Sequence, residues 1–220
     1  MNAFVIALVG AESTGKTALA SALQAALQAA LQQPGRSVAC VPEYLREFCD
    51  SHGRTPQPHE QARIAAEQTR RIAAAANAHD IVIADTTALM TAVYSDLVFG
   101  DTSLYASAEA AHACCQLTLL TALDLPWRAD GLQRDGPHVR EPVDALVRAA
   151  LGRARVGYAV VSGSGGARTQ AALASVQRAL APPPADDAGT ARWQWHCERC
   201  GEAGCERQSR QSLWPGLARD

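Results

Sequence analysis

Eight consecutive residues carry the clearest chemistry in the sequence. They are Gly10, Ala11, Glu12, Ser13, Thr14, Gly15, Lys16 and Thr17. They match G-x-x-x-x-G-K-[ST], the Walker A loop, whose backbone N–H groups surround phosphate oxygens because its glycines permit unusual backbone angles. In such loops the lysine reaches the β- and γ-phosphates and the last hydroxyl ligates Mg²⁺. The sequence therefore predicts a binding site for ATP and Mg²⁺, with Lys16 as a catalytic residue and Thr17 as a metal ligand.

The flanking sequence has the form that a phosphate-binding loop requires. Residues 4–9 form a continuous apolar run, which indicates a strand buried on both faces. Residues 15–33 repeat leucine at every fourth position and end at Pro34-Gly35, which predicts an amphipathic helix. The helix adds its positive N-terminal end to the site. Lys16 is the single lysine among 20 basic residues, at a place where a slim ammonium fits and a broad guanidinium would not.

Strands and helices are predicted to alternate along the rest of the body. Further apolar runs predict strands, and further periodic segments predict helices. The four later strands are expected at 37–41, 81–84, 117–120 and 158–161, and helices at 58–78, 89–97, 103–115, 143–155 and 169–180. Alternation of this kind produces right-handed crossovers and a parallel sheet covered on both faces. We therefore expect an α/β fold, a P-loop kinase-like three-layer α/β/α sandwich with a five-stranded parallel sheet.

Asp85 follows directly on the apolar strand at 81–84. A carboxylate at this place can hold Mg²⁺ or accept a proton from an attacking hydroxyl, as a Walker B aspartate does. The alternative is that Asp85 caps the N-terminus of the next helix, which starts near Thr86 and Thr87. Because a phosphate-binding loop is present, we predict the catalytic and metal-binding role.

Composition limits the classes of function. The 220 residues are 48% hydrophobic and carry a formal net charge of -2, so we expect a packed core and no nucleic-acid partner. No apolar stretch is long enough to span a membrane, and no signal peptide is recognised at the start of the sequence. The scattered cysteines do not form a disulfide pattern, so a cytoplasmic location is expected. The oligomeric state is left open.

Pro182-Pro183-Pro184 ends the periodic pattern, so we predict a boundary there. Residues 1–181 would form the P-loop kinase or ATPase domain, and residues 182–220 a tail containing tryptophan and cysteine. The tail holds a candidate set of zinc ligands, His196, Cys197, Cys200 and Cys205. Their spacing is short for a closed tetrahedral site. The alternatives are exposed or reactive thiols, or a site that a second chain completes.

Four motifs, in order along the chain, resemble those of the ribosylnicotinamide kinase domain of NadR-type bacterial proteins. They are the loop at 10–17, Glu43-Tyr44-Leu45-Arg46-Glu47, the strand ending in Asp85-Thr86-Thr87, and the segment Asp124-Leu125-Pro126-Trp127-Arg128-Ala129-Asp130-Gly131-Leu132-Gln133-Arg134. The resemblance runs from Phe4 to about Leu180. Thr87 stands where that family has a second aspartate, and Gln133 displaces the last arginine of the motif by one position.

The resemblance implies a reaction and a set of residues for it. The family transfers the γ-phosphate of ATP to the 5′-hydroxyl of nicotinamide riboside, a step of NAD biosynthesis. Carboxylates for sugar hydroxyls would come from Glu43, Asp85 and Asp124. Tyr44 or Trp127 would provide an aromatic face for the cationic ring, although Trp127 could instead be a hinge residue packed on the core.

Arginines complete the implied site. Arg128 and Arg134 lie in the segment that forms a lid over the phosphates in this family. Arg46 is expected at the substrate, or alternatively in a salt bridge with Glu43 or Glu47. The glycine-rich turn at 162–166 lies where kinases of this build admit adenine, and Arg168 would stack there, unless the segment is a plain turn.

Three functions therefore remain open. The first is a small-molecule kinase acting on a ribosyl hydroxyl, with nicotinamide riboside as the expected acceptor. The second is an ATPase or nucleotide switch that acts on a protein partner through its tail. The third is a nucleoside or nucleotide kinase of other specificity. The sequence does not choose among the acceptors.

Overall fold

A computed structural model of the protein describes residues 3–30, 36–129 and 136–181. Its centre is a five-stranded sheet in which all strands are parallel and follow the order β2-β3-β1-β4-β5. The strands are β1 (Phe4–Val9), β2 (Val38–Val41), β3 (Ile81–Asp85), β4 (Leu117–Thr121) and β5 (Tyr158–Val161). Each predicted strand is present, and the predicted five-stranded parallel sheet is confirmed.

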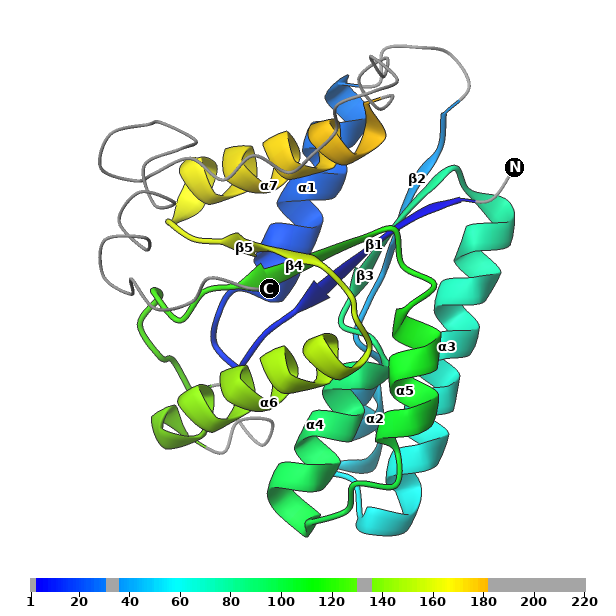
Figure 1. Cartoon of the computed structure of the whole chain (residues 1–220), viewed down its shortest axis with the longest axis vertical. Coiled ribbons are helices and arrows are strands. Elements are labelled where there is room, and N and C mark those ends of the chain that lie inside the picture. The colour runs from blue at the N-terminus through cyan, green and yellow to red at the C-terminus, as the bar shows by residue number, and fades with distance from the viewer. Residues whose placement is uncertain (1–2, 31–35, 130–135, 182–220) are drawn as a thin grey trace, which may run out of the picture. The chain divides into compact units, whose positions relative to one another are not determined.

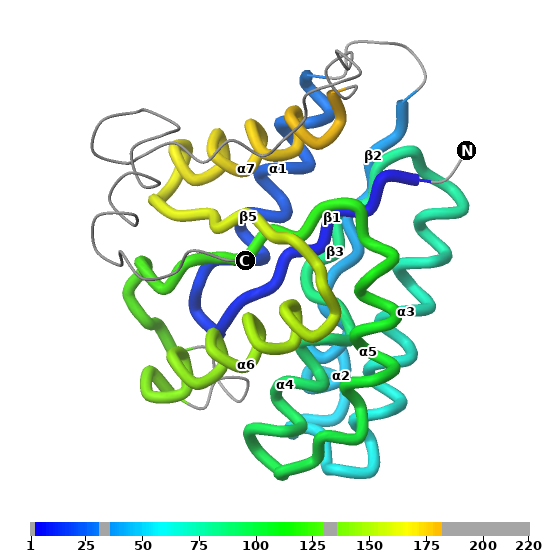
Figure 2. The backbone as a smooth tube through the Cα atoms, viewed as in Figure 1, coloured from blue at the N-terminus to red at the C-terminus, as the bar shows by residue number. Residues whose placement is uncertain are grey.

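Helices cover both faces of this sheet (Figure 1). The α-helices are α1 (Lys16–Ala30), α2 (Tyr44–His52), α3 (Gln61–Ala78), α4 (Ala88–Phe99), α5 (Tyr105–His112), α6 (Arg140–Arg153) and α7 (Gly165–Leu180). Helices α1 and α7 lie side by side on one face, and α3, α4, α5 and α6 lie on the other (Figures 1 and 2). This arrangement is the predicted three-layer sandwich.

The side chains of the strands alternate between the two layers. Ile6, Leu8 and Ile83 pack against α1 and α7, together with Leu23 and Val176 from those helices. The opposite faces of β1 and β4 contribute to a second core that is filled mainly by α4, α5 and α6. Because both faces are covered, the central strands are apolar without alternation, as parallel strands usually are.

Helix α2 is the main element that the sequence prediction missed. Its nine residues contain two aromatic and four charged or histidine side chains, a composition that predicts a polar turn more readily than a helix. Burial of Phe48 and Cys49 against Ile64 of α3 stabilises it, and Gly53 ends it in the left-handed conformation with φ of 65°.

The helix predicted at 58–78 is divided in the structure. Its first turn is a 3₁₀ helix, η1 (Pro58–Glu60), and the α-helix begins at Gln61. A capping box closes this turn, in which the Glu60 carboxylate accepts from the Gln57 N–H. Among the helices of the described residues, none combines the length and apolarity needed to cross a membrane.

Candidate functional site

The phosphate-binding loop connects β1 to α1 at the point where the strand order reverses, because β1 lies between β3 and β4. Open α/β sheets bind ligands at such points, beyond the carboxyl ends of the strands. Gly10 has φ of 142°, and a Cβ atom there would lie 2.2 Å from the Thr121 Oγ1. Only glycine fits, so the loop can leave β1 close against the end of β4.

Hydroxyl groups fix the base of this loop. The Thr14 Oγ1 donates to the Ala11 carbonyl at 2.7 Å and shares a hydrogen bond of 2.7 Å with the Thr121 Oγ1. The Lys16 Nζ donates to the Gly10 carbonyl at 2.9 Å and to the Ala11 carbonyl at 2.8 Å. The ammonium group therefore lies folded over the loop, where it can turn from carbonyls to phosphate oxygens.

A buried arginine supports the same loop from behind. Arg168 of α7 is 4% exposed, and its guanidinium donates to the Thr14 carbonyl at 2.9 Å and to the Gly163 carbonyl at 2.8 Å. It also forms an ion pair of 2.8 Å with Asp124. Desolvation would raise the pKa of Asp124, but hydrogen bonds from Arg168 and the Gly163 N–H hold that pKa below its usual range. The pair joins the loops after β4 and β5 to the phosphate-binding loop.

Two loop side chains contact the segment that the sequence analysis assigned to a lid. The Trp127 indole N–H donates to the Glu12 carboxylate at 2.7 Å, and the Gly136 N–H donates to the same oxygen at 3.1 Å. The Arg128 N–H donates to the Ser13 Oγ at 2.7 Å. Trp127 and Arg128 of the segment, and Gly136 just after it, are therefore attached to the phosphate-binding loop by hydrogen bonds, and the Trp127 bond is made by its N–H group.

Asp85 is the last residue of β3 and is 2% exposed. Its Oδ1 is buried and has no hydrogen-bond partner among the described residues. Burial, with the Asp85 charge nearby, raises the pKa of the Cys40 thiol to about 11. Helix α4 is capped by Thr87, whose side chain accepts from the Leu89 N–H at 3.3 Å. The alternative of Asp85 as an N-cap is therefore not what the structure shows.

The donor set fits Mg²⁺ chemistry. A buried carboxylate oxygen without a partner is costly, and a hard dication that prefers charged oxygen would offset that cost. Thr17 is an exposed residue at the start of α1, so a ligand can approach it. No group of three or more metal-ligating side chains occurs among the described residues. Water and phosphate oxygens would therefore complete the coordination, as is usual for Mg²⁺ with nucleotides.

A cavity of about 440 Å³ opens beside the loop. One part of its wall is the phosphate-binding loop itself, from Glu12 to Thr17. The other part is formed by α2, α4, the first residue of α3 and the segment before it. This second wall includes Leu45, Arg46, Cys49, Thr55, Pro56, Gln61, Met90, Thr91, Tyr94, Val98 and Phe99, and Glu43 and Thr86 also line the cavity. The cavity is thus large enough to hold a small molecule next to the phosphate-binding loop.

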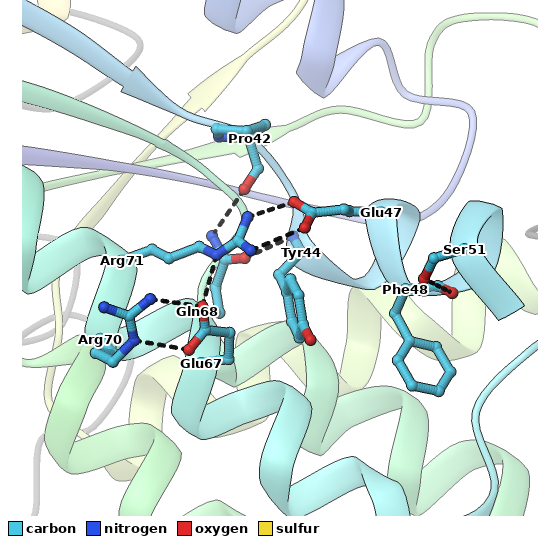
Figure 3. Close-up of polar contacts among 9 residues, drawn as sticks. All are labelled: Pro42, Tyr44, Glu47, Phe48, Ser51, Glu67, Gln68, Arg70 and Arg71. Atoms are coloured by element: carbon cyan, nitrogen blue, oxygen red, sulfur yellow. Dashed lines mark hydrogen bonds and ion pairs between the residues drawn. The ribbon is translucent and has the colours of Figure 1, made fainter.

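Gln68 of α3 sets the positions of Glu43 and Thr86. Its buried amide accepts from the Tyr44 N–H at 2.7 Å and donates to the Pro42 and Thr86 carbonyls at 3.3 Å each. Figure 3 shows the amide reaching the backbone on both sides of Glu43. Thr86 has a positive φ of 74°, a conformation that costs energy for a β-branched residue and persists only when neighbours enforce it. One side chain therefore fixes both loops at the edge of the cavity.

The structure brings together part of the predicted substrate site. Glu43 and Arg46 line the cavity and lie 3.9 Å apart as an ion pair, which is the arrangement foreseen as the alternative for Arg46. Tyr44 instead packs its ring beneath the Arg71 guanidinium, 4.4 Å from the ring centroid, in the cluster of Figure 3. Arg71 also bonds Glu47 and Glu67.

Several other predicted residues lie outside the cavity wall as far as the described residues define it. Trp127, Arg128 and Arg168 contact the phosphate-binding loop, and Asp124 bonds Arg168. The Arg168 guanidinium, which the sequence analysis expected to stack on adenine, bonds backbone carbonyls and Asp124. Arg134, His196, Cys197, Cys200 and Cys205 lie outside the described residues, so their roles stay predictions.

The sequence analysis missed several residues that line the second wall of the cavity. Gln61, Thr91 and Tyr94 line the cavity, whereas the periodicity of α4 marked only its apolar positions. The spacing of three between Thr91 and Tyr94 places both side chains on one face of α4. That pair of polar groups, in a helix whose other polar residues are Ser95 and Asp96, was the available signal.

Comparison with known proteins supports the fold. A family model described as an AAA domain matches residues 5–168, and no curated protein sequence matches. Two structures of NadR, in complex with NAD and AMP-PNP and in complex with NR, superpose with a TM-score of 0.63 at 20% and 19% identity. Each alignment covers 80% of this chain and 49% of the NadR chain, so this chain spans about half the length of NadR.

A thymidylate kinase from Ehrlichia chaffeensis also superposes, with a TM-score of 0.55 and 13% identity over 81% of this chain and 99% of the other. These likenesses concern the fold alone. Because the family model covers most of the sequence, the identity of the chain follows from it: the protein belongs to the AAA domain family and has the P-loop kinase-like fold that NadR also has.

Proposed function

We propose that the protein is an ATP-dependent phosphotransferase that transfers the γ-phosphate to a hydroxyl of a nucleoside-type molecule. The observation that carries this proposal is a cavity of about 440 Å³ that is lined both by the phosphate-binding loop and by residues of α2 and α4. An enzyme that only hydrolyses ATP needs space for a water molecule, whereas this cavity admits a second organic molecule. We further propose nicotinamide riboside as the acceptor and its 5′-hydroxyl as the attacking group.

Different residues would bind the phosphates, the Mg²⁺ and the acceptor in this reaction. Backbone N–H groups of the loop and Lys16 would hold the phosphates and stabilise the charge that develops during transfer. Thr17 and Asp85 would hold Mg²⁺, which would neutralise part of the phosphate charge. Glu43 lines the cavity, where it would bind a sugar hydroxyl. We propose that Gln68 keeps Glu43 and Thr86 in place for this purpose.

The acceptor is tested by measuring ADP and phosphorylated product together. Purified protein is incubated with ATP and Mg²⁺ and with nicotinamide riboside, other nucleosides, thymidine monophosphate or no acceptor. We expect one mole of nicotinamide mononucleotide per mole of ADP. Phosphate release that does not depend on an acceptor would instead support an ATPase or switch, and transfer to a monophosphate would support a nucleotide kinase. The cytoplasmic location expected from the sequence stays a prediction.

A further inference from the structure

The buried Arg168 side chain lies in an unfavourable place for its own helix. It is the fourth residue of α7 and is 4% exposed. A cation in the first turn of a helix is disfavoured, because the helix dipole places positive charge at that end. Burial of a charge also costs free energy unless the charge is paired. Contacts outside α7 must therefore hold the guanidinium where it is.

These contacts join three loops at the carboxyl ends of the strands. The guanidinium donates to the Thr14 carbonyl of the phosphate-binding loop at 2.9 Å and to the Gly163 carbonyl, after β5, at 2.8 Å. It also donates to the Asp124 carboxylate, after β4, at 2.8 Å, and this carboxylate accepts from the Gly163 N–H at 2.5 Å. A planar guanidinium carries its donors in a rigid arrangement, so it can serve several acceptors at once. Arg168 thus fixes the Thr14 carbonyl relative to β4 and β5.

The contact with the Thr14 carbonyl also determines how the next N–H group is oriented. No cis peptide bond occurs among the described residues, and in a trans peptide the carbonyl and the following N–H point in opposite directions. Because the Thr14 carbonyl is turned to the buried Arg168, the Gly15 N–H is turned to the other side, and Gly15 lines the cavity. Backbone N–H groups of such loops are the donors that bind phosphate oxygens.

This peptide would rotate easily without the arginine. Gly15 has φ of 77°, and a glycine adopts positive and negative φ with similar ease. The Thr14 hydroxyl bonds the Ala11 carbonyl and the Thr121 hydroxyl, but these bonds hold the side chain of Thr14 and not its carbonyl. A rotated peptide would present a carbonyl oxygen to the phosphate in place of an N–H group, and the two negative groups would repel each other.

We propose that Arg168 and Asp124 are positioning residues for phosphate binding. Their ion pair holds the Thr14 carbonyl, so that the Gly15 N–H stays directed at the phosphate oxygens. This inference rests on the part of the proposed function in which the loop binds the phosphates of ATP, and it is independent of the acceptor. It gives both residues a role other than adenine stacking and binding of a sugar hydroxyl, which the sequence analysis expected.

The test separates phosphate binding from base binding. Calorimetric titrations measure the Kd of ATP, GTP and inorganic tripolyphosphate, each with Mg²⁺, for the wild type, Arg168→Met, Arg168→Lys and Asp124→Asn. Tripolyphosphate has no base, so a residue that stacks on adenine cannot contribute to its binding. Arg178→Met is the matched control, because Arg178 is an exposed arginine of the same helix. Thermal unfolding followed by circular dichroism establishes that each variant is folded.

We expect Arg168→Met to weaken the binding of all three ligands by the same factor, about 10- to 100-fold. Arg168→Lys keeps the charge but lacks the planar set of donors that reaches Thr14 and Asp124 together, so it should recover only a small part of the affinity. Asp124→Asn removes the ion pair but leaves the carbonyl contacts, so its loss should be smaller, about three- to tenfold. Arg178→Met should bind all three ligands as the wild type does.

A loss that is confined to ATP would assign Arg168 to the adenine ring and overturn the inference. Wild-type affinity for tripolyphosphate in a folded Arg168→Met variant would also overturn it, and would show that the ion pair only stabilises the fold. If Arg168→Met does not fold, the same comparison in Asp124→Asn decides between these outcomes. A wild type that binds none of the three ligands would contradict both proposals. The titrations need no acceptor, so a protein that binds ATP but phosphorylates nothing would refute the proposed function and still allow this test.

Discussion

The two walls of the cavity are assembled in different ways. The phosphate wall is one continuous segment, residues 12–17, held from behind by Arg168, Thr121 and their hydrogen bonds. The opposite wall collects single residues from α2, α4 and the start of α3, held at its edge by Gln68. Adjacent residues determine the geometry of a continuous loop, whereas the opposite wall forms only when three helices pack together. The first wall is thus suited to a constant phosphate group and the second to a variable acceptor.

Replacing Lys16 should break the phosphate wall with the largest effect on turnover. Lys16→Ala removes the charge that stabilises the transferring phosphoryl group, so kcat should fall by about a thousandfold or more. Lys16 lies half-buried in the phosphate-binding loop, so its removal costs little packing and the melting temperature should change little. Initial-rate kinetics and thermal unfolding measure the two quantities.

An unchanged turnover in Lys16→Ala would contradict the assignment of this loop to ATP. Lys16→Arg serves as the control for charge. It keeps the positive charge but replaces a compact ammonium with a broad planar group, so it should be as inactive as the alanine variant. If arginine restores activity, charge alone suffices at this position.

Asp85→Asn should reduce turnover by about a hundredfold while the KM for ATP changes much less. The amide has nearly the same size, but it binds Mg²⁺ poorly and cannot take a proton. Kinetics over a range of Mg²⁺ concentrations should show a higher Mg²⁺ requirement in the variant.

Thr87→Val is the matched control for Asp85, because Thr87 is the residue that caps α4. This change should lower the free energy of unfolding by about 1 kcal/mol and leave turnover nearly unchanged. Wild-type turnover in Asp85→Asn at ordinary Mg²⁺ would remove Asp85 from the site.

Much of the phosphate wall and of the sheet was predictable from the sequence. The strands are continuous apolar runs and the loop is a local motif, so neither depends on distant residues for its recognition. Confirmation came for all five strands, their parallel arrangement and the position of the loop after β1. The roles assigned to individual site residues remain predictions.

The opposite wall was not predictable, for a physical reason. Gln61 and Gln68 look like ordinary polar positions of a helix, and only the packing of α3 against α4 and α2 shows that one lines the cavity and the other bonds three backbone groups. Arg168 likewise looks like a surface arginine near a glycine-rich turn. Its burial depends on Asp124, 44 residues away in the sequence.

Lowering the pH should reduce the stability of the fold near the opposite wall, because it protonates His112. This side chain is 1% exposed and bonds the hydroxyls of Thr87 at 2.8 Å and Thr118 at 2.9 Å, so it connects the start of α4 to β4. Burial lowers the pKa of His112 to about 4, below its ordinary value of 6.5. The neutral form is therefore favoured in the folded state, and its contribution is complete above pH 6.5 and is lost as the pH falls towards 4. The loss is on the order of 3 kcal/mol.

Urea unfolding between pH 7.5 and 4.5 measures this effect. His112→Gln cannot gain a charge and still offers hydrogen-bonding groups, so its stability at neutral pH should be lower but its dependence on pH should be shallower. Identical pH dependence of the wild type and His112→Gln would show that other groups control acid stability.

The smallest effect is expected from removing residues 182–220. Both walls of the cavity, and every contact described for them, lie within residues 1–181, and Pro182 cannot continue α7 as a regular helix. A chain that ends at Ala181 should therefore unfold cooperatively and keep the kcat and both KM values of the full chain within about twofold.

This outcome would also separate the kinase from a switch that acts through its tail, because only the switch needs these residues for its action on a partner. The measurement is steady-state kinetics of the shortened and full chains beside a full-length Cys197→Ser, Cys200→Ser control. Loss of cooperative unfolding in the shortened chain would show that the tail contributes to the core. Loss of activity in both the shortened chain and the cysteine control would show that the tail supports activity through its thiols.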